Sequence, residues 1–156
     1  MAFETAKAYI ENMGYGDRVM HFDVSSATVE LAAVAVGTQP AKIAKSLTFS
    51  VDDAPVMILT AGDMKIDNPK YKAFFHTKAK MLTADEVLEK IGHAVGGVCP
   101  FGIKEGVKVY LDESLKRFDY IYPACGDAAS AVKLTNDELE KLSGTLGWID
   151  VCKPMA

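Results

Sequence analysis

The sequence predicts a single domain of the α+β type within the broad α/β class, in which helices cover a mixed, largely antiparallel sheet. Segments with helical spacing of apolar residues are interspersed with short runs that read as strands. Hairpin-like strand pairs outnumber clean strand–helix–strand units, which favours antiparallel pairing. The chain has 156 residues, 49% of them hydrophobic, which is enough for one core. We find no linker, repeat or low-complexity tract and expect one domain over residues 1–156.

The first half of the chain is expected to begin with a helix and then to alternate between strands and helices. The predicted elements are a helix over residues 3–14, a strand over 17–24, a helix over 28–36, a helical turn into a strand over 41–51, and a strand over 55–62. Gly14 and Gly37 stand where glycine commonly ends a helix. Ser25, Ser26 or Thr28 would cap the second helix. The residues Asp52-Asp53-Ala54 predict a hairpin turn between the last two strands.

The second half carries clearer helix boundaries. The predicted elements are helices over residues 67–75, 83–92 and 135–144, and strands over 108–115, 120–126, 130–134 and 148–152. Asn68 is the expected cap of the first of these helices, with Pro69 at its first position. The pairs Thr83 with Glu86 and Thr135 with Glu138 each predict a capping box.

Composition argues for an ordinary globular protein of the cytoplasm. No segment approaches 18 consecutive apolar residues, and the N-terminal stretch carries Glu4 and Lys7, so neither a membrane span nor a signal peptide is expected. The three cysteines are far apart, which disfavours a disulfide framework or a zinc site and favours a reducing compartment. The histidines show no metal-ligand spacing, and we predict no structural metal.

Charge is unevenly distributed along the chain. The formal net charge is −4, which counts against a protein that coats nucleic acid or binds DNA. Residues 64–80 nevertheless hold five lysines against Asp67 alone, whereas residues 135–150 are mostly acidic. The lysine-rich segment is compatible with contacting one end of an RNA, although a solvated face explains the same pattern.

The stretch "HAVGGVCPFG", residues 93–102, is the most unusual loop. It lacks the lysine ending of a phosphate-binding P-loop, the spacing of a dinucleotide-binding loop and the serine of a hydrolase elbow. Paired glycines let the backbone approach a ligand, and backbone N–H groups held in such a loop can stabilise an oxyanion. A rigid structural turn explains the stretch equally well.

Two side chains outside the glycines, Cys99 and Lys45, are candidates for chemistry. Cys99 could be a nucleophile if a base lay near, but a buried cysteine is more often a small apolar filler. Lys45 opens a strand on which Leu47 and Phe49 would face inward, so it would either point into a pocket or lie along a strand edge. His21 and His76 have no evident partners, and Asp127 and Ser130 belong to a polar turn.

Several segments taken together resemble a known family. "KIAKSLTF", "GGVCPFG", "VYLDESL", "IYPACG" and "AVKLTNDELEKL" occur in this order and resemble the YbaK and prolyl-tRNA synthetase-associated editing domains, especially the free-standing members. The resemblance implies a curled, partly barrel-like mixed sheet. It also implies a cytoplasmic, metal- and cofactor-independent aminoacyl-tRNA deacylase, most plausibly acting on Ala- or Cys-tRNA(Pro). The alternative is a non-catalytic module that binds a nucleotide or a tRNA 3′ end.

The resemblance also implies roles for individual residues. Lys45 and Gly97 would be catalytic, with Lys45 anchoring the aminoacyl end or a terminal phosphate and the loop amides holding the ester carbonyl. The expected substrate-binding residues are Gly96, Val98, Cys99, Pro100, Phe101, Gly102, Asp127 and Ser130. Water, helped by a ribose hydroxyl of the substrate, would attack the ester, so Cys99 would be a pocket wall.

One segment departs from the family pattern. Ala124 and Ala131 stand where some relatives carry a serine and an acidic residue, and Asp127 and Ser130 are the available substitutes. The expected partners are the acceptor end of aminoacyl-tRNA and a synthetase or elongation factor that supplies further affinity. No membrane and no DNA are expected to be bound.

Overall fold

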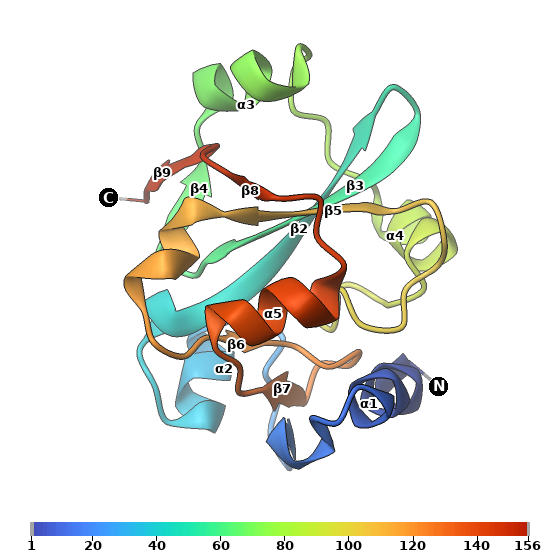
Figure 1. The fold of residues 1–156 in the computed structure, drawn as a ribbon, viewed down its shortest axis with the longest axis vertical. Coiled ribbons are helices and arrows are strands. Elements are labelled where there is room, and N and C mark those ends of the chain that lie inside the picture. Colours follow the sequence, from blue (N-terminus) through green and yellow to red (C-terminus); the bar gives the residue numbers. More distant parts are fainter. Residues whose placement is uncertain (1, 156) are drawn as a thin grey trace.

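A five-stranded sheet crosses the centre of the molecule (Figure 1). The computed structural model describes residues 2–155. In spatial order the strands are β6 (Tyr122–Pro123), β2 (Ile43–Val51), β3 (Ala54–Ala61), β5 (Lys108–Asp112) and β8 (Trp148–Ile149). Two small sheets pair β1 (Val19–His21) with β7 (Ser130–Val132) and β4 (Met64–Ile66) with β9 (Cys152–Pro154). The prediction of a mixed α/β domain is confirmed.

The sheets contain both antiparallel and parallel strand pairs, with the longest pairing antiparallel. The three antiparallel pairs in the described chain are β2 with β3, β1 with β7 and β4 with β9. The three parallel pairs are β2 with β6, β3 with β5 and β5 with β8. The hairpin signals in the sequence identify only sequential neighbours, whereas these parallel pairs join strands that are distant in sequence.

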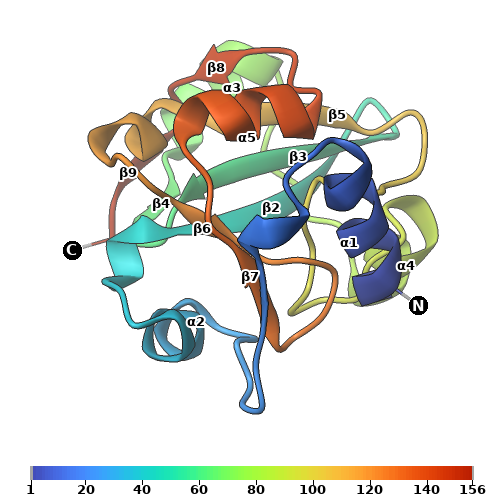
Figure 2. The same ribbon diagram turned by 60° about the horizontal axis from the view of Figure 1, so that its bottom comes forward.

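An isolated antiparallel bridge between Ile121 and Leu134 connects the sheets. It lies next to β6 on one side and next to β7 on the other, so the five-stranded sheet continues into β7 and β1. This continuation curls the sheet at its β6 edge. Figure 2 shows α1 and α2 on opposite sides of β7, at the end where the sheet curls.

Five α-helices and three short 3₁₀ turns occur within residues 2–155. The helices are α1 (Ala2–Asn12), α2 (Val29–Val36), α3 (Asn68–Phe75), α4 (Ala84–Lys90) and α5 (Asn136–Ser143). The 3₁₀ turns are Gly16–Arg18, Pro40–Lys42 and Glu113–Arg117. Both predicted capping boxes are present, and the hydroxyl of Thr28 caps α2 by accepting from the N–H of Leu31.

Three local predictions need correction. Asp67, not Asn68, caps α3, because the Asp67 carboxylate accepts a hydrogen bond from the N–H of Lys70. The predicted strand over residues 148–152 is divided into β8 and β9, because the N–H of Val151 leaves the ladder and donates to the carboxylate of Asp112. The strand β4 was not expected, since three residues are too few for a periodicity signal.

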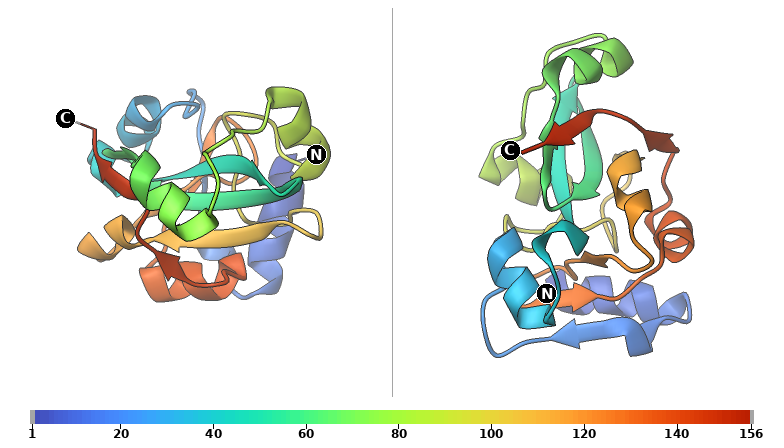
Figure 3. Two further views of the ribbon diagram at one scale, coloured as in Figure 1. Left: turned by 90° about the horizontal axis from the view of Figure 1, so that it is seen from above. Right: turned by 90° about the vertical axis from the view of Figure 1, so that its left-hand side faces the viewer.

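The two faces of β2 contribute to different cores. Ala44 packs into the larger core with residues of α1, α4 and α5, and the cross-strand partners of Ser46 and Thr48 belong to that core as well. Phe49 lies on the opposite face and packs with Tyr71 of α3 and with Cys152 of β9. Figure 3 shows α3 at one end of the molecule and α1 and α2 at the other.

Candidate functional site

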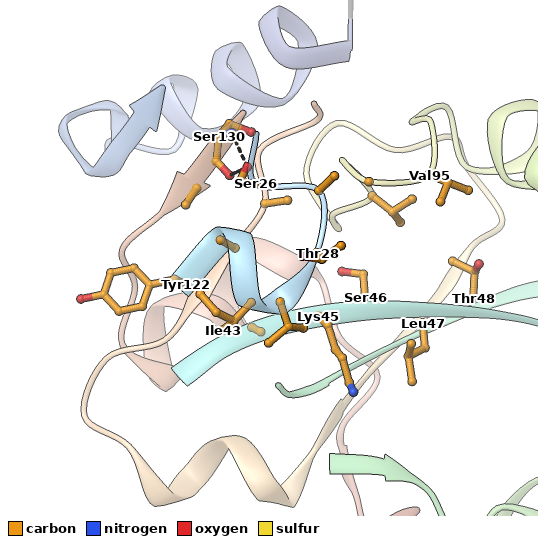
Figure 4. A pocket seen from close by; sticks show the side chains of 18 of the residues that line it. Ser26, Thr28, Ile43, Lys45, Ser46, Leu47, Thr48, Val95, Tyr122 and Ser130 are labelled. Carbon is orange, nitrogen blue, oxygen red and sulfur yellow. Dashed lines mark hydrogen bonds between the residues drawn. The ribbon is translucent and has the colours of Figure 1, made fainter. Parts of the chain in front are cut away.

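A cavity of about 410 Å³ lies between α2, β2 and the loop that follows α4. Figure 4 shows it from close by, with β2 running along its floor. Its wall is mostly apolar or small: Val29, Ala32, Ile43, Ala44, Leu82, Val87, Val98, Ala124 and Ala131. Serine and threonine supply most of its polar atoms, from Ser26, Thr28, Ser46, Thr48 and Ser130.

The floor of the cavity is a part of β2 that lacks a neighbouring strand. On this edge β6 pairs only with Ile43 and Ala44, and the next contact is the hydrogen bond from the N–H of Leu82 to the carbonyl of Thr48. Because backbone groups alternate in direction along a strand, the N–H and C=O of Ser46 point to the same side as those of Thr48. They therefore face the gap between the two neighbours, and the cavity floor offers an N–H donor and a C=O acceptor.

The Ser46 side chain adds a further polar group at this position. Its hydroxyl oxygen is buried and has no hydrogen-bond partner among the described residues. In Figure 4 the Ser46 hydroxyl points to the side of β2 on which Thr28 and Val95 lie. A buried hydroxyl without a partner is costly, so a ligand that bonds to it would regain that free energy.

The loop reaches the cavity through a tight turn from Ala94 to Gly97. The N–H of Gly97 donates to the carbonyl of Ala94 at 3.0 Å, and Gly96, the third residue of the turn, has φ +98°. This is the conformation that a type II turn requires of glycine. The N–H groups of Gly96 and Val98 have no hydrogen-bond partner in the described part of the chain, so they are free to donate to a ligand.

Gly97 is required by the close approach of another backbone. A Cβ atom at Gly97 would lie 2.4 Å from the Cα atom of Asp127, closer than real Cβ contacts occur. Gly97 is not part of the cavity wall, whereas Gly96 and Val98 are. The backbone of the turn therefore packs directly against the backbone of the segment that leads to β7.

The second half of the loop lies behind the wall. Cys99 and Phe101 are fully buried in the larger core, and neither Pro100 nor Gly102 lines the cavity. The thiol of Cys99 donates to the carbonyl of Phe101 at 3.8 Å, and burial raises its pKa well above the usual range. A thiol held in this way is not a thiolate nucleophile.

His93 donates to the same carbonyl. Its Nε2 lies 2.8 Å from the oxygen of Phe101, its Nδ1 has no partner in residues 2–155, and the ring is fully buried. Burial lowers the pKa of His93, so the neutral ring with the proton on Nε2 fits this geometry. The His93 ring therefore supports the loop and does not activate Cys99.

Lys45 lines the cavity with its stem, but its ammonium group leaves on the opposite side of β2. Figure 4 shows Lys45 and Leu47 on one side of the strand and Ser46 and Thr48 on the other. The Nζ atom donates to the carbonyl of Met64 and lies 4.0 Å from the Sδ of Met155. Burial lowers the pKa of Lys45 despite the nearby charge of Asp63. The expected alternation with Leu47 and Phe49 holds, and it directs the ammonium group away from Gly96 and Val98.

Asp127 and Ser130 are occupied by structural hydrogen bonds. Asp127 lies outside the cavity wall and contacts Nε2 of His21 at 2.9 Å, so His21 has a partner that sequence reasoning missed. Burial favours a raised pKa for Asp127, but the hydrogen bonds from His21 and from the N–H of Ala129 outweigh it and lower the pKa. Ser130 lines the cavity, but its hydroxyl accepts from the N–H of Cys125 and donates to the carbonyl of Asp127.

The cavity wall carries no aspartate, glutamate, histidine or cysteine among the described residues. The site can therefore bind an apolar group of modest size beside several neutral hydrogen-bonding groups. It presents backbone amides, as an oxyanion-binding site does, and no general base of its own.

A comparison with family models decides what kind of domain this is. Residues 23–142 match the model described as "Aminoacyl-tRNA editing domain". The chain belongs to the aminoacyl-tRNA editing domain family. The resemblance to the YbaK and prolyl-tRNA synthetase-associated editing domains is thereby confirmed, and editing domains of this family act on aminoacyl-tRNA.

Individual relatives agree with this membership. YwhH, an uncharacterised protein of Bacillus subtilis, is 47% identical over 154 residues, which are 98% of this chain and 98% of YwhH. The proline–tRNA ligase of Halalkalibacterium halodurans is 39% identical over 90 residues, which are 57% of this editing domain but only 16% of the ligase. A crystal structure of a candidate trans-editing enzyme for prolyl-tRNA synthetase is 29% identical, with 97% of each chain covered and a TM-score of 0.88.

Neither a cluster of metal-binding side chains nor a membrane-spanning helix occurs in the described part of the editing domain. Within residues 2–155 no group of three or more histidine, cysteine, aspartate or glutamate side chains could hold a metal ion. No helix in the same range is long and apolar enough to cross a membrane.

The sequence predicted only part of the cavity wall. Of the expected site residues, Lys45, Gly96, Val98 and Ser130 line the cavity, whereas Gly97, Cys99, Pro100, Phe101, Gly102 and Asp127 lie outside its wall. The sequence did not indicate that Ser46 and residues of α2 line the cavity. The unpaired edge of β2 was not visible in the sequence, because it depends on where β6 and residues 80–82 stop.

Proposed function

We propose that this editing domain is a trans-editing deacylase that hydrolyses the ester of a mischarged tRNA, with Ala- or Cys-tRNA(Pro) as substrates. The observation that carries the proposal is the small apolar cavity with unpaired hydrogen-bonding groups along one side. The similarity to prolyl-tRNA synthetases supports proline tRNA as the carrier. Such an enzyme would be a single domain that works in the cytoplasm.

The cavity favours a small, uncharged aminoacyl side chain. Ala32, Ala44, Ala124 and Ala131 form much of its wall, and no carboxylate among the described wall residues would pair with a cationic side chain. An apolar pocket rejects a larger side chain by steric overlap, although it separates side chains that differ by one methylene only about 10- to 200-fold. We therefore expect alanine and cysteine esters to be accepted and bulky esters to be rejected.

The loop amides are the proposed oxyanion site. The free N–H groups of Gly96 and Val98 would donate to the ester carbonyl oxygen, where negative charge develops as water attacks. The N–H of Gly97 already donates to Ala94, so Gly97 would act by holding the turn in place. Water adds to the carbonyl carbon, the bond from that carbon to the ribose oxygen breaks, and the ribose oxygen leaves with a proton.

The proton transfers would use the substrate. Because no carboxylate, histidine or cysteine of the described chain lines the cavity, we assign activation of the water to a ribose hydroxyl of the tRNA. The unpaired N–H, C=O and hydroxyl groups of Ser46 would orient the α-amino group and the ester beside the loop. A synthetase or elongation factor could add affinity for the rest of the tRNA.

Lys45 keeps a proposed anchoring role at the rim. In this structure its ammonium group donates to the carbonyl of Met64 on the other side of β2, so it must leave that carbonyl to reach a substrate in the cavity. Its lowered pKa reflects partial burial, which strengthens its interaction with an anionic group.

Incubation with a panel of aminoacyl-tRNAs tests this function. We expect Ala- or Cys-tRNA(Pro) to be deacylated faster than Pro-tRNA(Pro), and Lys45→Ala to lower the rate at least tenfold. Lys108→Ala, which removes an exposed lysine on β5, is the matched control and should retain the wild-type rate. If no member of the panel is hydrolysed faster than in buffer, the deacylase proposal fails.

The alternative is a module that binds a tRNA 3′ end without turnover. The absence of carboxylate, histidine and cysteine side chains from the described cavity wall favours it. Measurable binding of uncharged tRNA together with no hydrolysis of any ester in the panel would support this alternative over the enzyme.

A further inference from the structure

Three lysines near α3 carry charges that the rest of the described chain does not neutralise. Lys72, Lys78 and Lys80 are exposed, and none forms an ion pair within residues 2–155. Lys70, in contrast, is bound to the carboxylate of Asp150 at 2.9 Å. Asp67, the acid nearest in sequence to Lys72, is occupied as the cap of α3. We call Lys72, Lys78 and Lys80 the lysine track.

Two of these lysines face a groove. A cavity of about 570 Å³ lies between α3 and the segment that follows it, and Asn68, Pro69, Lys72, Lys78 and Ala79 line it. Asn68 and Lys72 are four residues apart on α3 and therefore share a face of the helix. Lys78 comes from the segment that follows the helix. Two lysines and a neutral amide side chain therefore line the groove.

The segment from Lys78 to Leu82 leads from this groove to the proposed active site. The carbonyl of Lys80 accepts from the N–H of Ser50, and Met81 forms an antiparallel bridge with Phe49. These contacts hold residues 80–82 extended along β2. Residues two apart on an extended segment lie on one side of it, about 6–7 Å apart, which is the spacing expected of Lys78 and Lys80. Figure 1 shows the chain descending from α3 past the hairpin of β2 and β3 towards α4.

Met81 connects the two sites directly. It follows Lys80, is 57% exposed and lines the cavity proposed for the aminoacyl group. The lysine track therefore ends at the rim of that cavity. An extended strand of nucleic acid with its 3′ end in the cavity would pass over Met81 and then over Lys80, Lys78 and Lys72.

The lysine track differs in charge from the chain as a whole. The chain carries a formal net charge of −4, so a run of unpaired lysines is a local exception. Asp52 and Asp53 lie on the neighbouring hairpin turn, but no ion pair between them and the lysine track is present in the described chain. Adjacent ammonium groups that repel one another are stabilised when an anionic polymer binds and its counterions are released.

We propose that the lysine track binds the phosphate backbone of the RNA strand whose 3′ end occupies the cavity. This inference rests on the proposed function for the identity of the RNA, but binding can be measured without turnover. The lysines would contact phosphates only and carry no sequence information, whereas the cavity would select the aminoacyl group. The extended Lys78–Lys80 spacing suits successive phosphates of a single strand.

The test is equilibrium binding of uncharged tRNA(Pro) and of a short single-stranded RNA with the same 3′ end, across a series of salt concentrations. The variant is Lys72→Gln/Lys78→Gln/Lys80→Gln. The matched control is Lys108→Gln/Lys116→Gln/Lys141→Gln, which removes the same charge from β5, the 3₁₀ turn after it and α5. Circular dichroism checks that both variants are folded.

We expect the track variant to bind both RNAs about 30- to 100-fold more weakly at 0.1 M salt and to lower the slope of log K against log salt by about 2. The control should keep the wild-type slope. Equal slopes for the wild type and the track variant would overturn the proposal.

Hydrolysis distinguishes this proposal from the proposed function. The track variant should raise KM for mischarged tRNA and leave kcat unchanged, and it should hydrolyse 3′-alanyl-adenosine, which lacks the phosphates, at the wild-type rate. If the wild type hydrolyses neither substrate, the deacylase proposal fails, while the salt series still decides whether the lysine track binds RNA.

Discussion

The loop over residues 93–102 has two halves with opposite surroundings. In the first half Gly96 and Val98, whose N–H groups have no hydrogen-bond partner in the described chain, line a cavity. In the second half Cys99 and Phe101 are fully buried in the larger core, and the carbonyl of Phe101 accepts hydrogen bonds from His93 and Cys99. The thiol of Cys99 is therefore in the half that cannot reach a ligand.

This difference shows how the loop is built. The buried half anchors the backbone, and the half at the cavity offers only backbone N–H groups and an apolar side chain, so its shape is set by residues that touch no substrate. Changes in the buried half should mainly affect the free energy of unfolding, and changes in the cavity half should mainly affect turnover.

Phe101→Ala should have the largest effect on stability. Phe101 is completely buried, and removal of its ring leaves a void in the core. We expect a loss of about 3–5 kcal/mol in the free energy of unfolding, measured by denaturant titration. Phe74→Ala is the control. Because Phe74 is 43% exposed, this substitution should lower the free energy of unfolding much less. Similar losses in the two variants would contradict the assignment of Phe101 to the core.

Gly97→Ala should have the next largest effect on stability, a loss of about 1–3 kcal/mol in the free energy of unfolding. The added Cβ would meet the Asp127 backbone at 2.4 Å, and backbone atoms cannot move aside cheaply. Gly106→Ala is the control: nothing lies within 4 Å of its Cβ, and only its φ of +89° opposes the change. A Gly97→Ala protein as stable as the wild type would show that the turn is not locked against Asp127.

The pH dependence of stability should report on His93. Burial lowers the pKa of folded His93, so below its usual value of about 6.5 the unfolded chain binds more protons than the folded one. Stability should therefore be complete above about pH 7 and fall as the pH decreases towards 5, by at most about 1.4 kcal/mol per pH unit. His93→Gln should reduce this slope; an unchanged slope in the variant would show that His93 is not its source.

Cys99→Ala should have the smallest effect on turnover. The thiol is buried behind the cavity wall and its pKa is raised, so deacylation should stay within about twofold of the wild-type rate. The free energy of unfolding should fall slightly, because a small buried side chain is shortened. A hundredfold loss of activity in a folded Cys99→Ala protein would reinstate a thiol mechanism.

Local signals in the sequence predicted the helices well. The capping boxes at Thr83 and Thr135 and the turn at Asp52 and Asp53 depend on neighbouring residues, and all are present. The parallel pairs and the division of residues 148–152 were not predictable, because they depend on strands and carboxylates far away in sequence.

The candidate site was harder to predict than the fold. The family resemblance pointed to the loop and to Lys45, but it could not show that the ammonium group of Lys45 donates to Met64 on the far side of β2. Nor could it reveal Ser46, whose free hydroxyl and backbone groups depend on a gap between β6 and residues 80–82. Such gaps are properties of tertiary packing and leave no periodic pattern.

The central claim is that the cavity beside Gly96 and Val98 is where the ester is hydrolysed. The most direct measurement is kcat/KM for Ala-tRNA(Pro) in the wild type, in Val95→Trp and in Leu88→Trp. Both residues are exposed, at 66% and 55%, but only Val95 lines the cavity. We predict that Val95→Trp obstructs the cavity and lowers kcat/KM more than tenfold, while Leu88→Trp keeps the wild-type value. Equal activity in the two folded variants would contradict the assignment of the cavity as the active site.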